Sequence, residues 1–92
     1  MKFPIIAWKV ERMRSLPILN MTGIGNCIEC ERIMLDMALK MVKKAEGLNG
    51  FPCAIQTVPK HQEKSAIIFY FSLVFQSREE MEQFAESIKK GI

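Results

Sequence analysis

Two cysteines with the spacing Cys27-x-x-Cys30 are the clearest chemical signal in the sequence. They fall at the expected start of a helix, where free backbone N–H groups and the helix dipole favour the thiolate and lower the pKa of a thiol. Such a pair suits thiol-disulfide exchange. The same two residues also suit a structural role, because free cysteine packs well as a small buried hydrophobe. We favour the structural role.

The order of elements around this pair, with a strand and loop before it and a hairpin and helix after it, resembles the thioredoxin-like fold. This resemblance implies redox exchange by Cys27 and Cys30. The segment Thr57-Val58-Pro59 is similar to the one that precedes the cis-proline of glutaredoxins. However, Pro59 follows Cys30 too closely to leave room for the strand and helix expected between them. A thiol-disulfide redox protein is therefore kept as an alternative function.

A metal site is the second chemistry that the cysteines suggest. Cys27, Cys30, Cys53 and His61 are the ligand types of a Cys3His zinc site. A helix of about 20 residues is about 30 Å long, so Cys53, early in the following strand, is expected at the far end of the helix from Cys30. We therefore predict no metal and no cofactor, and we expect His61 in a solvated loop.

Residues of the N-terminal segment are candidates for contact with a partner. Trp8, Arg12 and Arg14 lie in or just after an expected edge strand. Tryptophan and arginine are frequent interface anchors, and an edge strand can pair with another chain. The same residues could instead belong to the core, and the sequence leaves both interpretations open. Lys9, Lys60 and Lys64 are candidate contacts for an anion.

Catalytic groups are scarce, since the chain has one His and one Asp and nothing in the sequence positions them together. We therefore expect a non-enzymatic protein-interaction module that acts as a regulator, adaptor or inhibitor. A homodimer formed through sheet edges is one version of this hypothesis. The net charge of +3 leaves weak nucleic-acid binding as a further alternative.

The elements that must position these residues follow from hydrophobic periodicity. Apolar residues at alternate positions from Ile67 to Phe75 predict a strand with one face in the core. Asn26 with Glu29, and Ser77 with Glu80, have the spacing of helix-capping boxes. The expected strands span 3–10, 16–21, 53–58 and 66–76, and the expected helices span 27–46 and 77–90. Residues 22–26 are expected to form a loop.

Length and composition bound the fold. A chain of 92 residues with 49% hydrophobic and 25% charged residues is expected to form one globular domain over 1–92. The order β-(β)-α-β-β-α predicts an α+β two-layer sandwich, a small, mainly antiparallel sheet packed by two helices as a ferredoxin-like variant. No apolar run is long enough to span a membrane. Early charges and an odd number of cysteines predict a cytoplasmic location.

Overall fold

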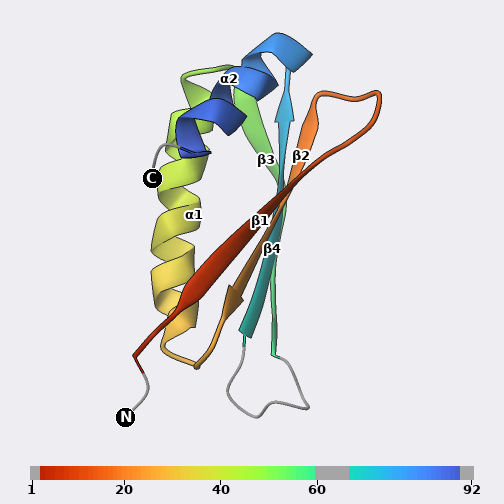
Figure 1. The fold of residues 1–92 in the computed structure, drawn as a ribbon. Helices are drawn as coiled ribbons and strands as arrows, with labels where there is room; N and C mark the ends of the chain where they lie inside the picture. The colour runs from red at the N-terminus through yellow and green to blue at the C-terminus, as the bar shows by residue number, and fades with distance from the viewer. Residues whose placement is uncertain (1–2, 60–66, 90–92) are drawn as a thin grey trace.

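The computed structural model describes residues 3–59 and 67–89 and contains four strands and two helices (Figure 1). The elements in chain order are β1 (Ile6–Arg12), β2 (Ile18–Gly25), α1 (Cys30–Glu46), β3 (Gly50–Pro59), β4 (Ile67–Phe75) and α2 (Arg78–Lys89). The strands form one sheet in the order β1-β2-β4-β3, and each neighbouring pair is antiparallel. The predicted α+β architecture of an antiparallel sheet with two packed helices is confirmed.

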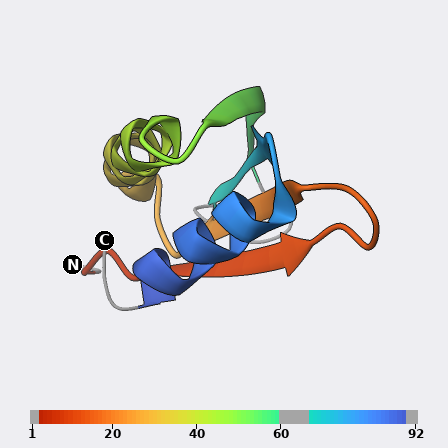
Figure 2. The same ribbon diagram turned by 90° about the horizontal axis from the view of Figure 1, so that it is seen from above.

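The sheet joins segments that lie far apart in the sequence. β4 lies between β2 and β3, so Thr22 of β2 is paired with Tyr70 of β4. Because β2 and β3 are both antiparallel to β4, they run parallel to each other, and α1 makes the crossover between them. Figure 2 shows α1 nearly end-on, while α2 runs across the view. The edges of the sheet are therefore β1 and β3.

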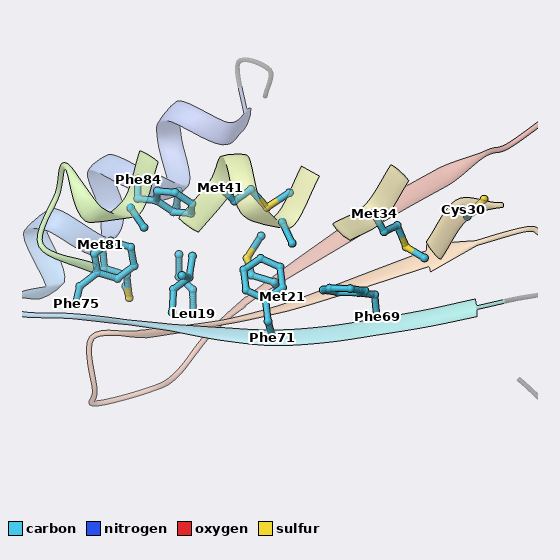
Figure 3. Packing of buried hydrophobic residues seen from close by; sticks show 14 of the residues in the cluster. Leu19, Met21, Cys30, Met34, Met41, Phe69, Phe71, Phe75, Met81 and Phe84 are labelled. Carbon is cyan, nitrogen blue, oxygen red and sulfur yellow. The ribbon is translucent and has the colours of Figure 1, made fainter. Parts of the chain in front are cut away.

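The core lies between the helices and one face of the sheet (Figure 3). Strand alternation gives β4 an inward row of large apolar side chains, as its sequence predicted. Methionine contributes much of the rest, since Met21, Met34, Met41 and Met81 are almost fully buried. The inward row of β4 consists of Ile67, Phe69, Phe71, Leu73 and Phe75. Both helices thus bury their apolar sides against the same face of the sheet.

The expected loop at 22–26 is wrong, because β2 continues to Gly25. Its glycines permit close approach of other side chains. A Cβ placed on Gly23 would lie 2.8 Å from Cζ3 of Trp8, and one placed on Gly25 would collide with Cβ of Cys30. The glycines therefore leave room on the inner face of β2 for Trp8 and for the start of α1.

The predicted cap at Asn26 is also wrong. Helix α1 begins at Cys30, and its N-cap residue, Glu29, makes no side-chain capping bond. Asn26 instead holds the segment before β1: its Oδ1 accepts a hydrogen bond from the backbone N–H of Ile5 at 2.8 Å, and its side-chain amide donates to the carbonyl of Phe3 at 3.0 Å. A long-range contact thus replaces the local one that the spacing predicted.

The start of α2 agrees with its capping signal. The backbone N–H of Glu80 donates to Oγ of Ser77 at 3.2 Å, and the Ser77 hydroxyl donates to the Glu80 carboxylate at 2.9 Å. Neither α1 nor α2 is long and apolar enough to cross a membrane, a finding that covers the helices in the described ranges.

Candidate functional site

A cleft with a volume of about 240 Å³ opens between β1, α1 and α2. Its walls are mainly apolar, and two exposed cations, Arg12 from β1 and Lys89 from α2, belong to its lining. The apolar lining comes from Trp8, Val10, Met21, Met41, Ala85 and Ile88. Concave, mostly apolar sites with a few polar groups are the usual form of binding sites in proteins.

Strand geometry places Trp8 between the cleft and the core. Ile6, Trp8 and Val10 share the inner face of β1, because alternate residues of a strand point to the same side. The indole is half-buried and meets the rings of Phe69 and Phe71 edge to face, with centroids 6.1 and 5.8 Å away. Its Nε1–H points to the sulfur of Met37 at 3.4 Å. Trp8 therefore has core contacts and also lines the cleft.

Arg12 is held beside the cleft by an ion pair with α2. Its Nε–H donates to both carboxylate oxygens of Glu82, at 3.0 and 2.9 Å. This hydrogen bond is the main reason that the pKa of Glu82 lies below its ordinary value. It likewise raises the pKa of Arg12. The pair fixes the position of a permanent cation next to the apolar cleft.

The other predicted contact residues are not brought together with Trp8 and Arg12. Arg14 is exposed in the connection between β1 and β2. Lys9 is exposed on the opposite face of β1 from Trp8, with its ammonium 3.6 Å from the Glu11 carboxylate. Lys60 and Lys64 lie outside the described residues. The candidate anion contacts therefore form no described common patch.

Cys27 and Cys30 are buried, and their sulfur atoms lie 3.4 Å apart. The Cys30 thiol also points to Oδ1 of Asn26 at 3.5 Å and to the carbonyl of Ile5 at 3.8 Å. The expectation of a lowered pKa at Cys27 is wrong: desolvation by burial, followed by hydrogen bonding to Cys30, raises the pKa of this thiol. The helix begins three residues later, at Cys30, so Cys27 is outside its first turn.

The cysteines do not assemble into a described metal site. Cys53 is exposed in β3, whereas Cys27 and Cys30 are buried. His61 lies outside the described residues. Within residues 3–59 and 67–89, no three side chains of His, Cys, Asp or Glu are grouped closely enough to hold a metal ion.

Sequence reasoning missed the part of the cleft that α2 supplies. Met81, Phe84, Ala85 and Ile88 have the i, i+3, i+4, i+7 spacing of a helix face that packs into a core. In the structure Met81, Phe84 and Ala85 are buried, whereas Ile88 is only half-buried and lines the cleft with Lys89. The amphipathic pattern contained Ile88, but it could not show that β1 would leave a gap beneath this end of α2.

The fold and the cleft define a small α+β protein with a mainly apolar groove bordered by two ion pairs, Arg12–Glu82 and Lys89–Glu86. Comparison of the chain with protein-family models, with curated proteins and with solved structures finds no match.

Proposed function

We propose that the protein is a non-enzymatic protein-interaction module whose cleft receives an apolar side chain of a partner. The observation that supports this proposal is the convergence of Trp8 and Arg12 from β1 with Ile88 and Lys89 from α2 around one cleft. A regulator, adaptor or inhibitor that works by occupancy needs such a surface and no reacting group.

Charge specifies the partner further. Arg12 and Lys89 line the cleft in ion pairs with Glu82 and Glu86. In the proposed complex, an Asp or Glu beside the partner's apolar anchor replaces Glu86 as the counter-ion of the exposed Lys89. A segment with Lys or Arg beside the same anchor would be disfavoured by like-charge repulsion. The proposed ligand is therefore an acidic peptide segment with one buried apolar side chain.

Trp8 provides the measurement, because it is the single tryptophan of the chain and lines the cleft. Peptides selected from a random library on the immobilised protein are titrated while Trp8 fluorescence and the indole N–H resonance are followed. We expect selected sequences with an apolar residue flanked by acids, and we expect them to shift both Trp8 signals. Selected peptides that bind without disturbing Trp8 would contradict the proposal.

A charge reversal tests the cation at the cleft. Lys89→Glu is expected to weaken binding of the acidic peptides about tenfold, on the scale of a close charge contact. Lys44→Glu, an exposed change near the end of α1, is the matched control and should leave affinity unchanged. Equal weakening by both variants would indicate a general charge effect rather than a site at the cleft.

A second candidate function is reversible disulfide formation, which the 3.4 Å contact between the Cys27 and Cys30 sulfurs favours. A disulfide requires the two sulfurs to approach to about 2.05 Å. Incubation with glutathione disulfide, followed by intact mass measurement, should show loss of two hydrogen atoms if the pair closes. Retention of both thiols after full equilibration would exclude this function, and Cys27→Ser is the variant that identifies the pair.

We also infer that the fold is a variant of the ferredoxin-like arrangement. Its support is the split β-α-β unit of β2, α1 and β3 with β4 between the two parallel strands. In this variant β1 takes the sheet position beside β2. Such a fold relationship gives no information about activity.

A further inference from the structure

The outer face of the sheet is a second surface that the proposed function does not use. Both described helices pack on the inner face, where β2 and β4 bury their alternate side chains. The outward positions of these two central strands are therefore not covered by α1 or α2. Ile24 of β2 remains 47% exposed and Tyr70 of β4 remains 42% exposed.

The outward positions of β2 and β4 contain no charged residue. They hold four aliphatic residues, one aromatic residue and three small or medium polar residues. These are Ile18, Asn20, Thr22 and Ile24 on β2, and Ile68, Tyr70, Ser72 and Val74 on β4. A sheet face that is permanently in contact with water usually alternates to polar and charged residues. The composition of this face is therefore typical of a buried surface rather than of one exposed to water.

Two of the polar residues on this face, Asn20 and Ser72, are already paired. The hydroxyl of Ser72 donates to Oδ1 of Asn20 at 2.8 Å, across the β2–β4 pairing. The Asn20 side-chain amide in turn points to the sulfur of Met13 at 3.2 Å. Removing water from polar groups is costly mainly when they lose their partners. Burial of this face against another apolar surface would leave these contacts intact.

Among the described side chains of the outer face, the charged ones lie at the rim. Lys9 and Glu11 lie on the same outer face, but on the edge strand β1, where they form an ion pair of 3.6 Å. An uncharged centre with a charged rim is the usual anatomy of a protein–protein interface. The rim pair is exposed, so it can stay hydrated while the centre is buried.

The size and twist of this face favour a second copy of the chain as its occupant. Four strands of about eight residues cover roughly 26 by 19 Å, from strand rises near 3.3 Å and spacings near 4.8 Å. This footprint of about 500 Å² approaches the roughly 600 Å² per partner at the small end of specific interfaces. Stacked sheets pack best when their twists match, and an identical sheet supplies the same twist about a two-fold axis.

We infer that the outer sheet face is the interface of a homodimer, in which β2 and β4 of the two protomers stack at the centre and β1 and β3 form the rim. Each protomer keeps its helices on the outside, so the dimer has four layers. The cleft beside Trp8 lies on the helix side and stays open. This interface uses sheet faces, not the sheet edges that the sequence suggested.

Sedimentation equilibrium over protein concentrations from about 1 to about 500 µM tests the dimer, a range that spans the affinity expected of a small interface. The wild-type protein is expected to rise from 10.6 kDa to twice that mass. Tyr70→Lys and Ile24→Lys each place a charge in the buried centre, and each is expected to weaken association at least tenfold. Circular dichroism establishes whether each variant is folded. If one of the two variants does not fold, the other alone tests the interface.

Leu39→Lys is the matched control, because Leu39 is 54% exposed on α1 and lies on the helix side. This variant is expected to dimerise like the wild type. A wild-type mass of 10.6 kDa throughout the range would overturn the inference. So would undiminished association of folded Tyr70→Lys and Ile24→Lys, or dissociation caused by Leu39→Lys alone, which would place the contact on α1.

Discussion

The ion pair between Arg12 and Glu82 shows how individual side chains position one element, α2, against another, β1. It joins the end of β1 to α2, from positions far apart in the sequence. Because the folded protein holds the pKa of Glu82 below its ordinary value, the pair stabilises the fold above the unfolded-state pKa of about 4.3. That contribution is lost as pH falls through the folded-state pKa of Glu82.

The lowered pKa of Glu82 predicts how the stability of the protein depends on pH. The free energy of unfolding should fall more steeply from neutral pH to about pH 3 in the wild type than in Glu82→Gln. The difference should be small and should shrink in 1 M salt, because 37% and 43% of the two side chains are exposed. Urea denaturation at a series of pH values measures it. Glu79→Gln, an exposed change on the same helix, should keep the wild-type slope.

The three cysteines differ in environment and should differ in reactivity. Cys53 is exposed, whereas Cys27 is buried with a raised pKa. Iodoacetamide at neutral pH should therefore modify Cys53 first, since alkylation requires an accessible thiolate. Peptide mass spectrometry at increasing times gives the order. Modification of Cys27 before Cys53 would show that the start of α1 opens readily.

At the scale of elements, the close approach between β2 and α1 depends on the absence of a side chain at Gly25. Gly25→Ala should destabilise the protein by about 1–3 kcal/mol, the usual range for overpacking, because the added Cβ would meet Cβ of Cys30. Gly47→Ala is the control: Gly47 has φ −66°, and the nearest atom to an added Cβ is 3.5 Å away. Chemical denaturation should show no loss of stability there, and equal losses in both variants would contradict this explanation.

Periodicity predicted the elements well and their ends less well. The alternating pattern of β4 and the stripe of α2 follow from burial on one face, so the sequence alone indicates them. The glycines at 23 and 25 also suit a loop, and only the contacts of Trp8 and Cys30 show that they belong to a strand. Asn26 has the correct spacing for a helix cap, but its side chain forms hydrogen bonds with the segment before β1 instead.

At the scale of the whole molecule, the sequence could not show which parts of the surface the two helices cover. The apolar residues of α1 span about half of the helix circumference at helical spacing, which favours cover on two sides. In the structure, however, Leu35 and Leu39 remain 42% and 54% exposed. Hydrophobic patterns identify which side chains avoid water, but they do not say which element covers them. The cleft and the open sheet face both arise from tertiary placement, which is why neither was predicted.

The position of β4 between β2 and β3 has a consequence for synthesis on the ribosome. The chain leaves the tunnel from its N-terminus, so β1, β2, α1 and β3 emerge before β4, the strand that pairs with both β2 and β3. A tethered nascent chain that has released residues 1–66 should remain sensitive to protease. Release of residues 1–92 should give abrupt protection, detectable by limited proteolysis of stalled complexes. Protection of the shorter chain would show that the first four elements fold without the central strand.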